Sequence, residues 1–278
     1  MFYHDGGKLQ YPVRVEKPNP VFAKALQQAI GGIQGEIRVC LQYMFQAFGS
    51  RGPSRYRDML LETATEEMGH IEMLATAVAL NLEGAPLDME EAAEDPIVAA
   101  KLGGMNVQHV IGTVMAAMPV DSNGVPFDCS HVYASGNAAA DMLANVTAES
   151  TGRMLAVQLQ RMTDDPGMKD MLSFLIARDT MHQNQFLAAW EEMGGPKNHP
   201  IPNDYPMEDE LQEVSYTFMT TGKDDSVPQP TGRWSKGMSI DGRGEFRMEH
   251  MQPRGDKPDL SPPPENAANQ RAQREGTS

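Results

Sequence analysis

Four long segments of helical periodicity, paired as two hairpins, constrain the fold of this 278-residue chain more than any other feature. The first segment begins at Asn19 and Pro20 and ends at Gly49, and the short link SRGPS leads to the second, from about Ser54 to Leu82. Asn followed by Pro is typical of a helix start, and Gly of a helix end. Because so short a link requires an antiparallel return, these two helices form one hairpin.

A second hairpin follows the same plan. Helical periodicity runs from about Asn137 to Met162 and again from about Met168 to Met193, with the turn TDDPG between the two segments. Residues 84–136 join the hairpins, which is enough chain for one long crossover with one or two short helices. Two hairpins joined in this way have the connectivity of ferritin-like proteins. The sequence therefore predicts an all-α fold, a ferritin-like four-helix bundle with one long crossover.

The C-terminal part of the chain has a different character, rich in proline, glycine and charged residues. Such a segment cannot bury enough apolar surface to form a core of its own. We therefore expect a bundle domain over residues 1–198, which includes an N-terminal arm and the crossover. Residues 199–278 are expected to form an extended, mostly irregular tail that wraps the bundle or neighbouring subunits.

Charge and hydropathy exclude several classes of partner. The formal net charge of −15 repels phosphate backbones, so we expect neither nucleic acid nor an anionic membrane as a partner. No apolar run reaches the roughly 18 residues of a membrane span, and the opening MFYHDGGKLQ does not read as a signal peptide. A cytoplasmic protein acting on a small neutral molecule fits these properties.

Acids and imidazoles occupy positions where an apolar stripe should run. In the second helical segment, Glu67 shares a face with Leu60 and Leu74. His70 lies three residues after Glu67 and therefore on the same face. The same helical periodicity places Glu66 on a more exposed side of the helix. An E-x-x-H pair thus points into the predicted core.

Each of the other three segments also turns a group of metal-binding type toward the bundle axis. These groups are Glu36, Glu149 and His182. Alone, each could be a solvated glutamate or a hydrogen-bonded core histidine. Together, however, buried carboxylates repel one another and are tolerated only when cations accompany them. We therefore predict two metal ions bound by Glu36, Glu67, His70, Glu149 and His182, the pattern of di-metal bundle proteins.

The fourth helix departs from that pattern at one position. Its motif is D-x-x-H, from Asp179 to His182, where the general di-metal bundle has E-x-x-H. Because aspartate is one methylene shorter, we expect Asp179 to remain outside the ligand set as a carboxylate that exchanges protons. Open coordination positions would then remain for solvent and substrate.

Several motifs together resemble one known family. They are LQYPVRVEKPNP near the start, GGIQGE followed by LQY, EEMGHIEM, TAES, DTMHQNQF, and GRWSKGMSIDGRGEF in the tail. Over essentially its whole length the chain resembles the manganese catalases, a non-haem family with two manganese ions. The resemblance implies disproportionation of hydrogen peroxide to water and oxygen, with Glu67 as the bridging carboxylate and Tyr43 as a phenol beside the cluster.

The resemblance implies further features, and at some of these positions the residues of this chain differ from those of the family. The family typically has glutamate where this chain has Asp179. Some relatives have arginine before the ligand of the third helix, where this chain has Ala148, with Arg153 one turn later as a substitute. A homohexamer is implied. Calcium is a further candidate cofactor, with Asp58, Glu62 and Thr221 as ligands, although a solvated acidic face is the alternative reading.

Two other functions remain open from the residues alone. A ferritin-like di-iron oxidase or iron store would use the same ligand types, because imidazole and carboxylate bind iron as well as manganese. The missing fourth carboxylate ligand and the long tail argue against it. The other alternative is a structural coat-type protein that retains the metal site.

Overall fold

The computed structural model describes residues 6–83, 116–198, 201, 206–220, 232–250 and 255–258. The chain divides into two units, Met1–Tyr205 and Pro206–Ser278. The first unit is helical and the second contains a small sheet. The short helices expected in the crossover fall outside the described residues. That residues 199–278 wrap the bundle or a neighbouring subunit stays a prediction.

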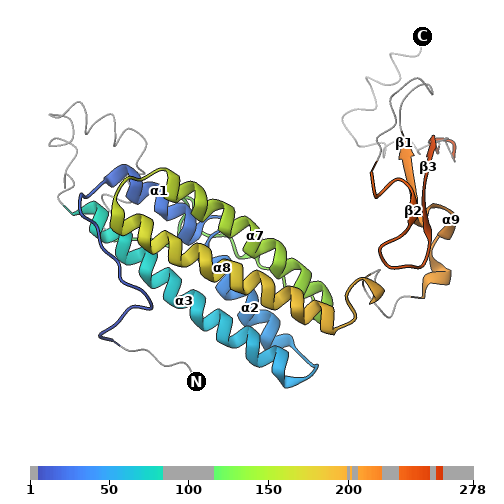
Figure 1. The fold of residues 1–278 in the computed structure, drawn as a ribbon, viewed down its shortest axis with the longest axis horizontal. Helices are drawn as coiled ribbons and strands as arrows, with labels where there is room; N and C mark the ends of the chain where they lie inside the picture. Colours follow the sequence, from blue (N-terminus) through green and yellow to red (C-terminus); the bar gives the residue numbers. More distant parts are fainter. Residues whose placement is uncertain are drawn as a thin grey trace, which may run out of the picture. The chain divides into compact units, whose positions relative to one another are not determined.

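The first unit is the predicted four-helix bundle (Figure 1). Its first rod consists of α1 (Pro20–Gly31) and α2 (Glu36–Gly49), and the second is α3 (Ser54–Leu82). The second hairpin consists of α7 (Ala138–Arg161) and α8 (Pro166–Glu192). A short 3₁₀ helix, η1, lies at Cys129–His131 before α7, and another, η2, at Gly195–Asn198 after α8.

Side-chain caps define where these helices begin. The Asn19 side chain accepts hydrogen bonds from the backbone amides of residues 21 and 22 at the start of α1. Asn137 caps α7 and Asp165 caps α8 in the same way. Pro20 and Pro166 occupy the first helical position, where no backbone donor is needed. The predicted starts near Asn19 and Asn137 are thus explained by local chemistry.

The connection between α3 and α7 joins opposite ends of the bundle. At one end, the amide of Asn19 donates to the side chain of Asn81, so α3 ends where α1 begins. At the other end, Gln46 near the end of α2 binds the carbonyl of Tyr133, just before α7. The connection between Leu82 and α7 must therefore run from one end of the bundle to the other, as a ferritin-like topology requires.

The expectation of one continuous first helix is wrong. The helix is interrupted between Gly31 and Glu36, and the interruption contains Gly32 and Gly35. A Cβ on Gly31 would lie 2.5 Å from the backbone of Val120 in the crossover, so this segment is packed too closely for a larger residue. As a consequence Ile33 is 46% exposed, and Glu36 becomes the first residue of a new helix.

The bundle core has two apolar halves. One half contains Phe22, Leu26, Leu74 and Leu172, and the other contains residues such as Phe186. Along α3 and α8 the positions between these halves are occupied by buried polar groups. The core is therefore interrupted at one level, which is where the candidate site lies. Among the described residues, no helix is both long and apolar enough to cross a membrane.

The second unit contains structure that the sequence did not predict. It includes η3 (Met207–Asp209) and α9 (Gln212–Ser215), followed by a sheet of order β1-β3-β2. Strand β3 (Glu245–His250) pairs parallel with β1 (Thr217–Thr220) and antiparallel with β2 (Gly237–Met238). These strands are only two to six residues long, which explains why a polar, glycine-rich sequence suggested an irregular tail.

Close packing of the N-terminal arm on α8 generates a testable prediction. A Cβ on Gly167 would lie 2.2 Å from the carbonyl oxygen of Arg14. Alanine favours a helix over glycine by about 1 kcal/mol, but overpacking against backbone costs about 1–3 kcal/mol. We expect Gly167→Ala to lower the thermal unfolding midpoint. Gly49→Ala is the control, because no atom lies within 4 Å of its added Cβ. A midpoint unchanged or raised in Gly167→Ala would contradict this packing.

Candidate metal centre

Helix α3 contributes two of the site residues from one turn. Glu67 and His70 lie three positions apart on its buried face and both are 0% exposed. Leu60 and Leu74, buried on the same face, place the pair within the apolar interior. The helical spacing seen in the sequence therefore places a carboxylate and an imidazole side by side, as predicted.

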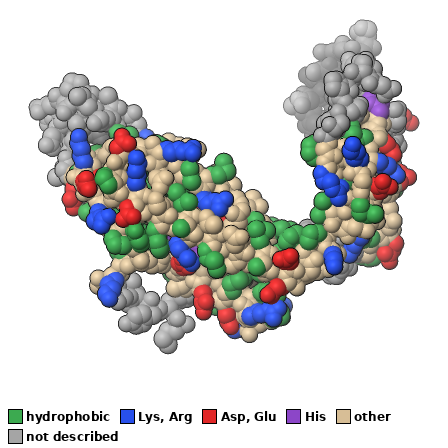
Figure 2. Space-filling view, in the orientation of Figure 1, with side chains coloured by type: hydrophobic (Ala, Val, Ile, Leu, Met, Phe, Trp, Pro, Cys, Tyr) green, Lys and Arg blue, Asp and Glu red, His purple; other side chains and the backbone are tan. Residues whose placement is uncertain are grey.

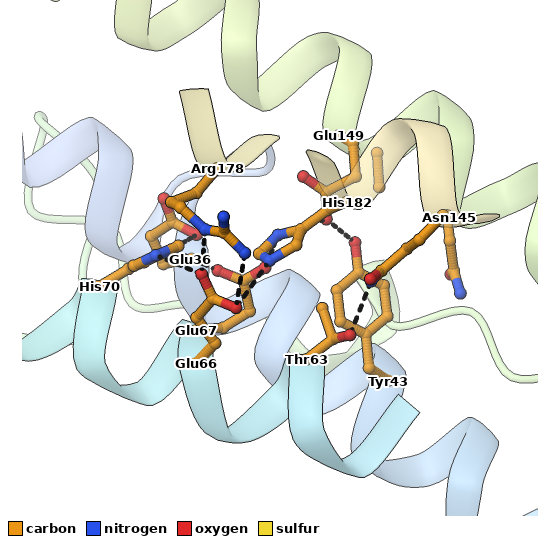
Figure 3. Close-up of polar contacts among 12 residues, drawn as sticks. Glu36, Tyr43, Thr63, Glu66, Glu67, His70, Asn145, Glu149, Arg178 and His182 are labelled. Carbon is orange, nitrogen blue, oxygen red and sulfur yellow. Dashed lines mark hydrogen bonds and ion pairs between the residues drawn. The ribbon is translucent and has the colours of Figure 1, made fainter. Parts of the chain in front are cut away.

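The other three rods bring one group each to the same place. Glu36 begins α2, where the helix dipole favours a negative charge, Glu149 comes from α7 and His182 from α8. Two groups of potential metal ligands result, each with its ligand atoms within 4.8 Å of one another. The first group is Glu36, Glu67 and His70, and the second is Glu67, Glu149 and His182. Glu67 belongs to both groups (Figure 3).

Glu67 lies between the two imidazoles. Its Oε2 atom is 2.6 Å from Nδ1 of His70, and its Oε1 atom is 2.8 Å from Nδ1 of His182. The outer carboxylates are farther away, with Glu36 at 3.9 Å from Nδ1 of His70 and Glu149 at 3.7 Å from Nδ1 of His182. The two rings are stacked with their centroids 5.9 Å apart. A carboxylate in this position can bridge two cations.

The central atoms of the site lack hydrogen-bond partners. Within the described part of the chain, neither oxygen of Glu67 and no ring nitrogen of His70 or His182 makes a hydrogen bond of acceptable geometry. Leaving such atoms buried and unpaired costs about 1–3 kcal/mol each, and more when they are charged. Carboxylate oxygens and imidazole nitrogens are ligands of divalent transition metals, so bound cations would satisfy these atoms.

The acids of the cluster differ in their proton affinities. Burial, and then the charge of Glu67, raises the pKa of Glu36 to about 7. Burial also holds the pKa of Glu149 well above its usual range. For Glu67 burial acts in the same direction, but the facing imidazoles His70 and His182 outweigh it and lower its pKa to about 2. Of these three acids, Glu67 therefore loses its proton most readily.

The imidazoles respond to the same carboxylates. Burial by itself would lower the pKa of His70, but Glu67 and the neighbouring acids hold it well above its usual range. For His182, burial is likewise outweighed, by Glu66 and Glu67, and its pKa is raised to about 10. In the metal-free state protons thus supply the positive charge that this anionic site requires.

Tyr43 lies beside the second ligand group. Its ring is fully buried against Phe186, and its hydroxyl donates a hydrogen bond to Oε1 of Glu149. Burial and the charge of Glu149 hold the pKa of this phenol well above its usual value, so it remains a donor. One turn away, a buried amide cluster of Gln42, Gln46 and Asn145 links α2 to α7. The Tyr43 side chain therefore orients Glu149.

Asp179 is buried but belongs to neither group of potential ligands. Burial, and then the charges of Glu36 and Glu67, holds its pKa well above the usual range. A Cβ on Gly152 would be 3.9 Å from its Oδ2 atom, so space exists around the carboxyl group. This environment suits a group that holds and releases a proton.

The candidate calcium ligands lie elsewhere. Asp58 and Glu62 are exposed on α3, and Asp58 forms an ion pair with Arg57 at 2.8 Å. Thr221 lies outside the described residues. In the ranges that the structure covers, neither acid belongs to a group of potential metal ligands.

Sequence reasoning missed two residues of the site. Arg178 binds both carboxylate oxygens of Glu66, with Nε to Oε1 at 2.5 Å and Nη2 to Oε2 at 3.3 Å. Arg153, expected to serve as the arginine of the site, instead donates to Thr180 on an exposed surface. The sequence did contain a signal for both residues, namely their spacing. Glu66 precedes His70 by four residues and Arg178 precedes His182 by four, so each lies on the same side of its helix as a histidine.

Comparisons with known proteins agree with this geometry. A family model described as manganese containing catalase matches residues 1–276. A manganese catalase of Bacillus subtilis is 46% identical over 95% of this chain and 96% of its own length. A manganese catalase of Lactiplantibacillus plantarum is 36% identical over 94% and 96%. The crystal structure of KatB, a manganese catalase from Anabaena, is similar in fold with a TM-score of 0.69 and 23% identity, covering 90% of this chain and 99% of KatB.

The raised pKa values predict that Mn²⁺ displaces protons. A ligand with a raised pKa keeps its proton to a higher pH in the metal-free protein, and metal ligands must be deprotonated. Because the pKa is about 7 for Glu36 and about 10 for His182, affinity for Mn²⁺ should fall as the pH is lowered from about 8 to about 6. Calorimetry in buffers of different ionisation enthalpy measures the released protons. Binding without proton release would contradict the prediction.

Proposed function

The chain belongs to the manganese catalase family and is an oxidoreductase that acts on hydrogen peroxide, and from this premise we propose that the buried cluster is its active site. The proposed ligands of two manganese ions are Glu36, Glu67, His70, Glu149 and His182. Glu67 is proposed as the carboxylate that bridges both ions.

One observation carries this assignment. The two oxygens of Glu67 each face Nδ1 of a different imidazole, at 2.6 and 2.8 Å, and none of these atoms has a hydrogen-bond partner among the described residues. One further carboxylate accompanies each imidazole, Glu36 beside His70 and Glu149 beside His182. Such a paired arrangement suits two cations that share Glu67.

When bound, two manganese ions supply the redox couple by which one hydrogen peroxide molecule is reduced to water and a second is oxidised to oxygen. The reduction takes up two electrons and two protons, and the oxidation returns the same number. A group near the cluster must therefore store protons between the two halves. Asp179 is proposed for this role, because its raised pKa allows it to hold a proton near neutral pH.

Tyr43 is proposed to act through Glu149. Its hydroxyl donates to Oε1 of that carboxylate, the oxygen that lies 3.7 Å from Nδ1 of His182. Hydrogen bonds of this kind orient a metal ligand and tune its basicity. The buried amides of Gln42 and Asn145 hold α2 and α7 together beside this contact.

Assembly, location and a third metal are further proposals. We propose a homohexamer in the cytoplasm, and light scattering should report six times the mass of one chain. Apolar side chains lie among charged ones on the visible face of the bundle (Figure 2), and Phe45 and Phe48 are more than half exposed, which supports self-association.

Calcium held by Asp58, Glu62 and Thr221 is proposed as a structural ion, and elemental analysis for calcium tests it.

Replacing one imidazole tests the ligand assignment. We expect His70→Ala to lose both bound manganese and oxygen evolution from peroxide, because it removes a ligand and leaves buried carboxylates unpaired. Elemental analysis of the wild-type protein should find about two manganese ions per chain. The control His131→Ala changes a histidine in η1 outside both ligand groups and should retain metal and activity. Metal or activity retained in His70→Ala would mean that the assignment is wrong.

The proton-storage role of Asp179 generates a separate prediction. Asp179→Asn should lower kcat by about 10²–10⁴-fold with manganese content unchanged, because a general acid–base group is lost and no ligand is. Asp179→Glu should restore much of the rate, since the carboxyl group is kept and Gly152 leaves space beside it. A parallel loss of manganese in Asp179→Asn would instead identify the residue as a ligand.

A further inference from the structure

Glu66 lies against the outer side of both imidazoles. Its Oε2 atom is 3.1 Å from Nε2 of His182, and its Oε1 atom is 3.6 Å from Nε2 of His70. The opposite nitrogen of each ring, Nδ1, faces Glu67. The two adjacent acids of α3 therefore contact the same two rings on different edges, Glu67 inside and Glu66 outside (Figure 3).

A neutral imidazole carries a proton on one nitrogen and a lone pair on the other. Only the lone pair can bind a metal ion, so each ring must keep its proton on Nε2 for Nδ1 to serve as the ligand. Both Nε2 atoms are buried and have no hydrogen-bond partner of acceptable geometry among the described residues. The nearby carboxylate of Glu66 can only accept, because an ionised carboxylate has no proton to donate.

We propose that Glu66 is a positioning residue that accepts the Nε2 proton of both His70 and His182 in the metal-bound protein. One carboxylate thereby sets the tautomer of both rings and directs both Nδ1 lone pairs to the cluster. This role rests on the proposed metal centre and adds to it a single acid shared by the two histidine ligands. Metal-bound histidines commonly donate their second N–H to a carboxylate, but here one carboxylate serves two rings.

Arg178 fixes the Glu66 carboxylate in this position. It approaches both oxygens from α8, through Nε at 2.5 Å and Nη2 at 3.3 Å. Each residue of this pair precedes a histidine ligand by one helical turn, Glu66 before His70 on α3 and Arg178 before His182 on α8. The pair therefore connects the two helices that carry the imidazoles, and it does so next to those imidazoles.

The N-terminal arm holds the backbone of the same turn. Gln10 donates a hydrogen bond from its side chain to the carbonyl oxygen of Glu66 at 2.9 Å. A Cβ on Gly69 would lie 2.0 Å from the side-chain amide nitrogen of Gln10, so glycine at this position lets the Gln10 side chain approach α3. Glu66 is thus held at its side chain by α8 and at its backbone by the arm, which limits the directions that its carboxylate can take.

A simpler role for Glu66 would be an ion pair with Arg178 that links α3 to α8. Both side chains are partly exposed, and a pair of this kind contributes little to stability. The two roles differ in what they change. An ion pair alone affects unfolding, whereas a shared acceptor also forms a hydrogen bond with the Nε2 proton of each imidazole.

Solid-state ¹⁵N NMR of histidine-labelled, zinc-loaded protein distinguishes the two roles, because Zn²⁺ is diamagnetic. The relevant imidazole signals are those that shift when zinc is added. In the wild-type protein we expect two such imidazoles, both with zinc on Nδ1 and with a proton on Nε2 whose ¹H shift is that of a hydrogen bond to a carboxylate. In Glu66→Ala both Nε2 protons should lose that shift, and affinity for Zn²⁺ and Mn²⁺ should fall by about 10–100-fold.

Glu66→Gln provides a finer test. A carboxamide keeps the shape of the side chain but offers one accepting oxygen and one donating NH₂ group. It can therefore accept from one ring only, and we expect one imidazole to keep its hydrogen-bonded Nε2 proton while the other loses that hydrogen bond. Arg178→Lys keeps the positive charge without the two parallel donors of the guanidinium, and it should retain both Nε2 hydrogen bonds with a smaller loss of affinity. Glu191→Gln, an exposed acid on α8, controls for the change in charge.

Two outcomes would overturn the proposal. If Glu66→Gln and Glu66→Ala both keep the wild-type ¹H shifts of the Nε2 protons and bind metal as tightly as Glu191→Gln, Glu66 is only an ion-pair partner of Arg178. If Glu66→Ala does not fold, the near-isosteric Glu66→Gln decides alone, by the same spectra and affinities. Wild-type protein that binds neither metal would instead overturn the proposed metal centre, and the role of Glu66 with it.

Discussion

The structure depends on one constraint, which is that several carboxylates and two imidazoles are buried together in the middle of an apolar bundle. Desolvation opposes the ionised form of every acid there, and it raises the pKa of Glu36, Glu149 and Asp179. Glu67 has a lowered pKa despite its burial, because an imidazole faces each of its oxygens. The site therefore requires positive charge, which protons supply in the metal-free protein and which metal ions supply in the proposed active form.

The bundle accommodates this polar layer by separating its apolar core into two halves. The helices α3 and α8 pass through both halves, so apolar packing above and below holds their polar turns in place. The first rod, made of α1 and α2, positions its polar group in the core in a different way. Its interruption at residues 32–35 lets α2 begin at Glu36, where the start of a helix favours a carboxylate. A continuous helix would not offer this acid the unpaired amides of a helix start.

Much of this could be predicted from the sequence, because helical periodicity is a local property. Spacing alone places Glu67 and His70 on one buried turn, and the caps at Asn19 and Asn137 mark helix starts. The interruption of the first helix was not predicted, because it depends on contact between Gly31 and a crossover residue distant in sequence. The sheet of the second unit was missed for a similar reason, since β1 and β3 pair across about thirty residues of chain.

The roles of Glu66 and Arg178 were missed for another physical reason. Periodicity assigns a residue to a face of its own helix, and Glu66 does lie on the more exposed side of α3, as predicted. What periodicity omits is the reach of a long side chain toward a neighbouring helix, which brings Glu66 to the outer edge of both rings. The glutamate that packs inward contacts Nδ1, and the glutamate beside it on the outer side contacts Nε2.

The single methylene that separates Asp179 from the usual glutamate has a larger consequence than its size suggests. The symmetric di-metal pattern would place two such carboxylates, one from each E-x-x-H unit, among the ligands. With aspartate at this position, α8 contributes only His182 to the ligand groups, and burial, together with the charges of Glu36 and Glu67, raises the pKa of the acid. A carboxyl group that is near the cluster and not consumed by ligation can exchange protons with it. In the proposed assignment α3 therefore supplies two metal ligands, whereas α8 supplies one ligand and the group proposed to store protons.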